Sequence, residues 1–265
     1  MTLLHNPKQN RLLAALPADE YRRLSPHLEL VPMPLNGSYY ESGGKLQHVY
    51  FPTTSIISLR YVMESGAQAE IAGVGKEGML GISVFMGAKA MPKQAFTRTV
   101  GYGYRLKSRL LLEEFNRAET MQHLLLRYTQ VLITQASQTV VCNRSHSVEQ
   151  KLCRWLLLNL DHASSNDSAV TQELLASSLG IRHDILTEAL RKLQQAGFIS
   201  YHGRNITVPN RSYLEDQTCE CYSMIKAKSD SLLFEPRFSK PVPDSVRAWS
   251  MARNTGAPRI LCSAS

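Results

Sequence analysis

Hydrophobic and polar positions follow different periods in different parts of the chain. Between about residues 28 and 106, short runs rich in β-branched and aromatic residues, such as 49–51, 56–61 and 69–74, are separated by glycine-rich turns. Short strands of this kind are typical of an antiparallel sandwich, roll or barrel. From about 108 to 143 the apolar positions recur at a helical period. The pattern therefore predicts an α+β chain, in which an antiparallel sheet domain precedes a long helix and a second small domain.

These changes of pattern divide the chain into four parts. Residues 1–115 are expected to form the sheet domain, 116–143 the long helix, and 144–222 the second domain. The tail, 223–265, has four prolines and no clear periodicity, so we expect it to be mostly disordered.

The long helix carries a stripe of residues at a spacing of 4-3-4-3-4, from Leu124 to Cys142. Such a spacing is typical of a coiled-coil seam. Two interpretations stay open: the stripe packs on the sheet domain of its own chain, or it meets the same helix of a second copy. We expect the second arrangement, a homodimer. The candidate dimerisation residues are Leu124, Tyr128, Val131, Leu132 and Gln135.

The second domain contains a sequence of start and stop signals for short elements. Ser147 and Gln150 fit a capping box, and Thr171 is a good N-cap for a helix over 172–179. Gly180 can supply a left-handed turn before a second helix, from about His183 to Ala196. Two short strands, 198–201 and 205–208, follow it. Helix, glycine turn, helix and hairpin is the order of a winged helix-turn-helix.

The second helix of this motif has an apolar and a polar side. Its apolar positions, expected to face the core, are Ile185, Leu186, Ala189, Leu190 and Leu193. The major groove of B-DNA admits one α-helix, whose first residues reach base edges, while the preceding helix contacts phosphates. An ordinary solvated helix face is the alternative interpretation of the polar side. The candidate DNA-binding residues are Thr171, Gln172, Arg182, His183, Asp184, Thr187, Glu188, Arg191, His202 and Arg204.

Several segments carry a resemblance to a known family. The most specific is 143–157, followed by 171–176 and 204–208, and segments 50–59 and 75–81 add to it. With these segments the chain resembles the Crp/Fnr superfamily of bacterial transcription regulators, over about residues 20–222. The resemblance implies an N-terminal β-roll like a cyclic-nucleotide-binding domain, a long dimerisation helix and a C-terminal winged helix. It also implies double-stranded DNA, a second copy and RNA polymerase as partners.

The sensor part departs from members of that family that bind cyclic nucleotides. Those members have a Gly-Glu pair and a later Arg, whereas here Gly81 precedes Ile82 and the later region reads Pro92-Lys93-Gln94. Lys93 lacks the bidentate fork of Arg. We therefore expect a regulator that does not bind cyclic AMP, with a possible effector pocket for an unknown small molecule at Gly81, Ile82, Lys93 and Gln94. A ligand-binding signalling module that acts through protein partners is the alternative function.

Composition limits the remaining possibilities. The net charge is +8, but the segment 144–222 has eight basic and nine acidic residues, so charge alone would not indicate DNA binding. The odd number of cysteines, five, is simplest in a reducing cytoplasm, and no apolar run predicts a membrane span. The pair Cys219-x-Cys221 falls short of a closed metal site, so no metal and no other cofactor is expected. We find no catalytic constellation, and expect no enzyme.

Overall fold

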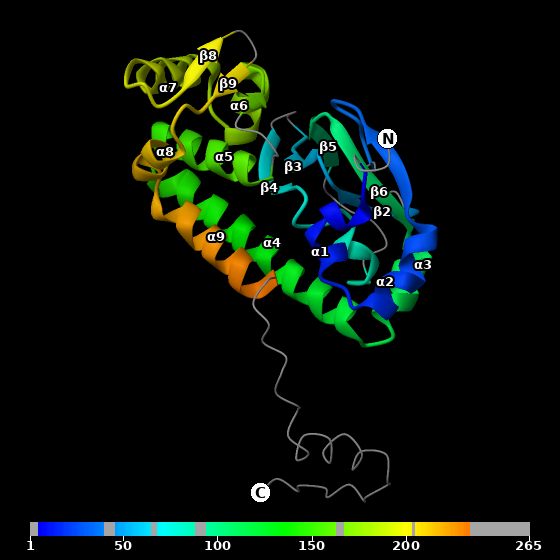
Figure 1. Cartoon of the computed structure of the whole chain (residues 1–265). Coiled ribbons are helices and arrows are strands. Elements are labelled where there is room, and N and C mark those ends of the chain that lie inside the picture. The colour runs from blue at the N-terminus through cyan, green and yellow to red at the C-terminus, as the bar shows by residue number, and fades with distance from the viewer. Residues whose placement is uncertain are drawn as a thin grey trace, which may run out of the picture. The chain divides into compact units, whose positions relative to one another are not determined.

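The computed structural model describes residues 5–39, 46–64, 68–87, 94–162, 167–202 and 205–233, which all belong to the compact unit Met1–Leu233 (Figure 1). Its first part contains η1 (Pro7–Gln9), α1 (Arg11–Ala14), α2 (Ala18–Leu24), η2 (Ser25–His27), β1 (Glu29–Met33), β2 (His48–Pro52), β3 (Ile56–Val62), β4 (Gln68–Val74), η3 (Ile82–Val84), β5 (Gln94–Thr99), β6 (Gly101–Lys107) and α3 (Ser108–Phe115). Its second part contains α4 (Thr120–Ser145), α5 (Val148–His162), β7 (Asp167–Ala169), α6 (Gln172–Leu179), α7 (His183–Gln195), β8 (Ser200–His202), β9 (Asn205–Thr207), α8 (Arg211–Gln217) and α9 (Glu220–Leu233).

The N-terminal strands form a β-roll of two three-stranded sheets, ordered β1-β6-β2 and β4-β3-β5, and every pairing is antiparallel. Side chains alternate between the two faces of a strand. The register accordingly sets Val49 opposite Leu106 and Phe51 opposite Tyr104, and all four are buried in one core. The α+β class and the antiparallel roll predicted from the strand pattern are confirmed.

The long helix α4 lies with one side against the roll. The five residues predicted for dimerisation, Leu124, Tyr128, Val131, Leu132 and Gln135, are all less than 9% exposed. The four apolar ones belong to the same core as the β-roll. These residues of the stripe are therefore buried against the β-roll of the same chain, which is the first of the two interpretations left open by the sequence pattern. The opposite side of α4 exposes Leu126, Ile133 and Val140.

A second core holds the C-terminal elements together. It joins apolar side chains of α5, α6 and α7 with Ile206 of β9, while β7, β9 and β8 form a small antiparallel sheet. The helix α5 begins as predicted, because the backbone N–H of Gln150 donates to the Ser147 hydroxyl and that of Ser147 donates to the Gln150 side chain. Among the described residues, no helix has the length and apolar character needed to cross a bilayer.

Residues 223–233, the first part of the tail that was expected to be mostly disordered, form a helix. Residues 223–233 continue the helix α9, which lies along α4 (Figure 1). Tyr222 and Ile225 are buried, and the Tyr222 hydroxyl donates to Asp161 of α5. Long-range packing stabilises this helix, and the local sequence pattern did not reveal it. The rest of the predicted tail lies outside the described residues.

Candidate nucleic-acid interface and its link to the β-roll

The turn between α6 and α7 has the geometry that its residues predict. Thr171 caps α6, since its hydroxyl accepts from the backbone N–H of Leu174 at 3.1 Å. Gly180 ends α6 in the left-handed conformation, with φ 64° and ψ 36°, which residues with a side chain rarely adopt. The helix α7 then begins at His183, after Arg182. The short helix, tight turn and second helix of the predicted motif are thus confirmed.

The two sides of α7 are sharply different. Leu186, Ala189, Leu190 and Leu193 are buried in the C-terminal core. Ile185 was predicted to join them, but it is 44% exposed. It lies one residue before Leu186 and so is turned by about 100° away from the buried line. The side opposite the core presents Arg182, His183, Asp184, Thr187, Glu188 and Arg191, all exposed.

The arginines on this exposed side are engaged by neighbouring carboxylates. Arg182 donates to both oxygens of Asp184, at 3.1 and 2.7 Å, and Arg191 donates to both oxygens of Glu188, at 2.9 and 2.6 Å. These hydrogen bonds hold the pKa of Asp184 and of Glu188 below the ordinary value of each group. Exposed ion pairs of this kind are weak because water competes for them. A phosphate or a guanine edge can therefore compete for either guanidinium.

The remaining predicted contact residues lie around the same helix. Thr187 donates to the backbone carbonyl of His183 at 2.8 Å and lies 3.5 Å from the Gln172 side chain. His202, at the end of β8, is exposed. Arg204 lies outside the described residues. Lys192 on α7 donates its ammonium to Glu149 of α5 at 2.9 Å and so connects α7 to α5.

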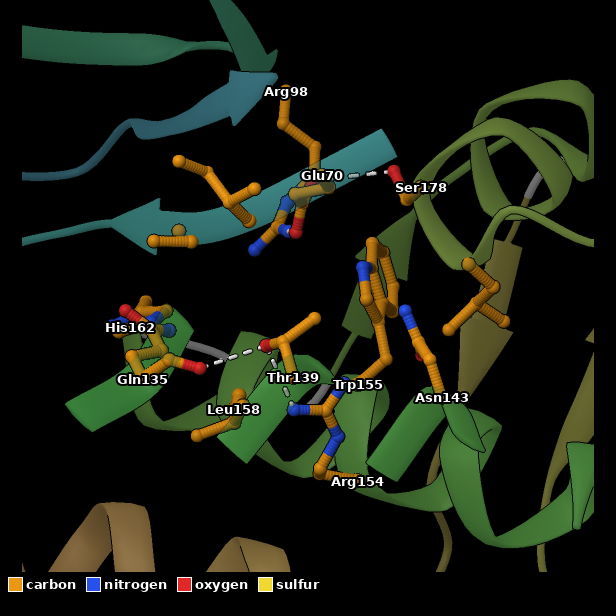
Figure 2. A pocket seen from close by; sticks show the side chains of 14 residues that line it. Glu70, Arg98, Gln135, Thr139, Asn143, Arg154, Trp155, Leu158, His162 and Ser178 are labelled. Carbon is orange, nitrogen blue, oxygen red and sulfur yellow. Dashed lines mark hydrogen bonds and ion pairs between the residues drawn. The ribbon is translucent and has the colours of Figure 1, made fainter. Parts of the chain in front are cut away.

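A buried polar cluster connects the winged-helix elements to the roll (Figure 2). We call it the junction, and it consists of Glu70 on β4, Arg98 on β5, Trp155 on α5 and Ser178 on α6. Arg98 pairs with Glu70 at 2.7 Å, and the two side chains are only 3% and 8% exposed. The Ser178 hydroxyl donates to the same carboxylate at 3.2 Å. One buried carboxylate thereby joins strand β4 of the β-roll to α6, the first helix of the helix-turn-helix motif.

The ring of Trp155 completes the junction. The Arg98 guanidinium lies 4.5 Å from the centre of this ring, a distance typical of a cation–π contact. On α5, the preceding residue Arg154 donates to the Thr139 hydroxyl of α4 at 3.1 Å. The helix α5 therefore contacts both the roll and the long helix through polar side chains. No sequence signal within 60–100 pointed to the Glu70–Arg98 pair, because the two residues meet only when β4 and β5 flank β3.

The loop after β4 makes a second connection. Glu77 lies 2.8 Å from Nδ1 of His162, at the end of α5. Burial alone would raise the pKa of Glu77, but the charge of His162 and hydrogen bonds from His162 and the Gly75 backbone hold it below its usual value. Gly75 and Gly78 are required here, since an added Cβ would lie 2.6 Å from His162 at the first position and closer still to the Tyr128 ring at the second.

The predicted effector residues are not gathered at one place. Gly81 and Ile82 line a cavity of about 110 Å³ against α4, and its other described lining residues are all apolar. Gln94 is not among the lining residues; it begins β5, opposite Arg60. Lys93 lies outside the described residues. A larger cavity, of about 250 Å³, lies between the loop after β4 and the helices α4, α5 and α9, and includes Lys76, Asp161 and Lys226.

Comparison with known proteins identifies the C-terminal domain. Residues 150–217 match the family of Crp-like helix-turn-helix domains. No curated protein matches the chain.

Solved structures share the fold over most of the described chain. FixK2 from Bradyrhizobium japonicum is 16% identical, covers 72% of this chain and 98% of its own, and has a TM-score of 0.61. A regulator of the crp/fnr family from Eubacterium rectale is 12% identical, with coverages of 79% and 98% and a TM-score of 0.62. A CRP-family regulator from Thermus thermophilus is 15% identical, with coverages of 71% and 95% and a TM-score of 0.58.

The fold and the site together define a protein with an N-terminal β-roll joined by a long helix to a winged helix-turn-helix domain. Residues 150–217 thus belong to the family of Crp-like helix-turn-helix domains, and the described chain shares the fold of solved Crp/Fnr regulators, in agreement with the resemblance seen in the sequence.

Proposed function

We propose that this chain is a homodimeric, sequence-specific DNA-binding regulator whose roll responds to a signal other than cyclic AMP. The observation that carries the proposal is the helix α7 within a Crp-like domain, held by a buried apolar side and presenting Arg182 and Arg191 on the exposed side. A helix with this division can enter a major groove. We keep the domain boundaries at 115 and 143 that the sequence pattern gave, and extend the C-terminal domain from residue 222 to residue 233, where α9 ends.

DNA binding is tested by fluorescence anisotropy on genomic fragments enriched by the protein. Arg182→Ala and Arg191→Ala are expected to weaken binding by roughly 5- to 150-fold, the range for losing one bidentate base contact. Arg109→Ala is the matched control, because Arg109 is also an exposed arginine, and it pairs with Glu113 on α3, far along the chain. Equal affinities for all four proteins would refute the proposed role of α7.

Binding should also weaken steeply as salt rises, since counterions are released when phosphates are neutralised. No binding to any genomic fragment at low salt, with cell extract added, would contradict the proposed function itself.

For the dimer we propose a different side of α4 from the one that the sequence suggested. The side chains at 126, 130, 133, 137 and 140 are exposed and follow the 4-3-4-3 spacing of a coiled-coil seam. Leu126, Ile133 and Val140 supply its apolar positions, at 51, 52 and 70% exposure. Pairing α4 with its copy along this seam would cover them, and would present two α7 helices to major grooves about 34 Å apart.

Sedimentation of Val140→Glu tests this seam. The charge is expected to shift the protein from dimer to monomer, because an unpaired carboxylate would have to be buried between the helices. Val100→Glu is the control, since Val100 is similarly exposed, at 63%, but lies in the turn between β5 and β6. A wild-type monomer, or a variant as dimeric as the wild type, would contradict the proposed seam.

The apolar cavity beside Gly81 and Ile82 supports the expectation about cyclic AMP, because its described lining offers no cation for a cyclic phosphate. Calorimetry with cyclic AMP and cyclic GMP tests the point. Micromolar binding would overturn this part of the proposal and would favour the alternative of a cyclic-nucleotide module.

A further inference from the structure

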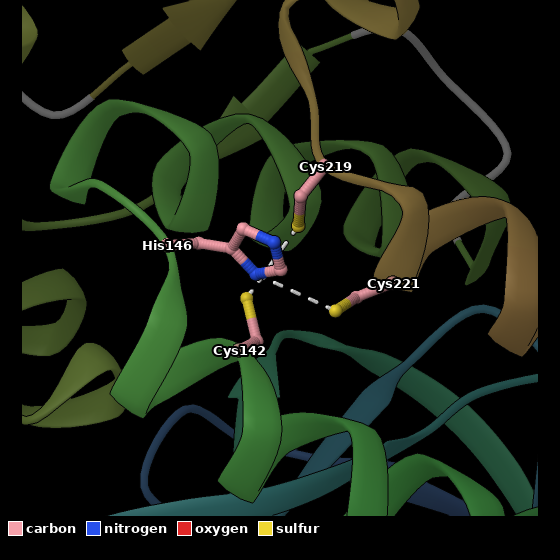
Figure 3. A group of neighbouring side chains, drawn as sticks. All are labelled: Cys142, His146, Cys219 and Cys221. Carbon is pink, nitrogen blue, oxygen red and sulfur yellow. Dashed lines mark hydrogen bonds between the residues drawn. The ribbon is translucent and has the colours of Figure 1, made fainter.

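Four side chains with metal-binding atoms meet where α4 ends and α9 begins (Figure 3). Cys142 and His146 lie four residues apart at the end of α4, while Cys219 and Cys221 flank the start of α9. The Sγ atoms of Cys142 and Cys219 are 3.6 Å apart, and Sγ of Cys221 is 3.6 Å from Nδ1 of His146. The three thiols are buried, and His146 is half-buried. We call this group the thiol–imidazole cluster.

The spacing within the cluster matches a single tetrahedral ion. All four ligand atoms lie within 4.8 Å of one another. Zn–S bonds of about 2.3 Å and Zn–N bonds of about 2.0–2.1 Å place neighbouring ligand atoms about 3.5–3.8 Å apart around a tetrahedron. The two separations of 3.6 Å agree with this value. Ligands of an iron–sulfur cluster bind different iron atoms and spread further apart, so one ion fits better.

The surroundings of the cluster also suit an ion. His146 turns Nδ1 towards the thiols, and its Nε2 lies 3.2 Å from the carboxylate of Glu220. A carboxylate on the far nitrogen is the common way of orienting a metal-bound imidazole. Zn²⁺ with three thiolates and a neutral imidazole carries a net charge of −1. The buried guanidinium of Arg154 interacts electrostatically with Cys142 and Cys221, and would offset that charge.

We propose that Cys142, His146, Cys219 and Cys221 bind one Zn²⁺ ion, which fastens the start of α9 to the end of α4. Binding replaces the three thiol protons, which pass to solvent, and involves no change of oxidation state. This proposal replaces the expectation, drawn from the sequence, that the chain has no metal site. In the sequence Cys219-x-Cys221 stood alone, because its partners lie more than 70 residues earlier and only the packing of α9 on α4 brings them together.

Elemental analysis of the full-length protein, expressed with added zinc and purified without chelator, is the first test. We expect one zinc per chain in the wild type, and much less than one in Cys142→Ser, Cys219→Ser and Cys221→Ser. Cys153→Ser is the matched control, because Cys153 is a buried free cysteine outside the cluster, and should keep its zinc. Circular dichroism of each variant checks that it is folded.

Titration of the metal-depleted wild type with Co²⁺ avoids any effect of substitution on folding. Tetrahedral thiolate coordination is expected to give intense d–d bands and a thiolate-to-cobalt charge-transfer band that saturate at one equivalent, and that Zn²⁺ then removes. Wild-type protein without bound metal and without these bands would overturn the proposal. Zinc retained when all three cysteines are replaced, or iron with inorganic sulfide in protein purified without oxygen, would do so too. None of these readouts depends on DNA binding.

Discussion

Removal of the Glu70 carboxylate should destabilise the protein far more than the loss of an ordinary surface charge. In Glu70→Ala the guanidinium of Arg98, 3% exposed, would lose its ion-pair partner at 2.7 Å while staying buried under Trp155. Breaking a buried ion pair from one side costs about 3–5 kcal/mol, because a charge is left without compensation. The Ser178 hydroxyl would lose its acceptor as well, so the contact between α6 and β4 should loosen.

Urea unfolding followed by Trp155 fluorescence measures this free energy at the junction itself. The chain has two tryptophans, and Trp249→Phe in every protein leaves Trp155 as the only reporter. A loss of about 3–5 kcal/mol should appear as a lower midpoint, with the slope unchanged if the unfolded state is the same.

Glu29→Ala is the control for this experiment. Glu29 pairs with Arg105 on the same roll at 2.7 Å, but the two side chains are 51% and 39% exposed, so the midpoint should barely move. A Glu70→Ala protein that unfolds at the same urea concentration as Glu29→Ala would refute the reasoning. Arg98→Met and the Glu70→Ala/Arg98→Met double variant close a cycle, and the double variant should lose less than the sum of the single losses.

Three further outcomes follow from the structure. Gly78→Ala should lower the melting temperature, measured by calorimetry, because its Cβ would overlap the Tyr128 ring, and overpacking costs about 1–3 kcal/mol; an unchanged Tm would contradict the close approach. Glu77→Gln should be less stable than the wild type near pH 7. Because the pKa of Glu77 is held below its unfolded value, mainly by His162 against the opposing effect of burial, this difference in Tm should shrink as pH falls below about 4, and a constant difference would count against the pairing. Asp184→Asn should free Arg182 and strengthen low-salt binding to arbitrary duplexes, read by anisotropy; weaker or equal binding would show that the pair does not restrain the arginine.

The elements of the second domain could be predicted because their signals are local. Thr171 as a cap, Gly180 as a left-handed turn and the apolar line from Leu186 to Leu193 each act within a few residues of the sequence. Such capping, turn and periodicity signals act independently of the tertiary contacts made by the rest of the chain.

The contacts made by each face could not be predicted in the same way. The helical period gave the stripe through Tyr128 and Val131, but both a partner helix and the roll can bury such a stripe, and only the folded chain decides between them. Glu70 and Arg98 lie 28 residues apart, and Cys142 and Cys219 lie 77 apart. These pairings depend on tertiary packing, as does α9, whose sequence is too polar to indicate a helix alone.

The paired arginines of α7 affect how such a regulator would be distributed on a chromosome. Because Asp184 and Glu188 compete with phosphates for the two arginines, binding to random duplex gains less free energy than it would with unpaired arginines. Few copies would then be bound at the millions of non-specific sites. The ratio of operator to non-specific occupancy would rise without any increase in affinity for the operator. A small cellular supply of the protein would suffice to fill its targets.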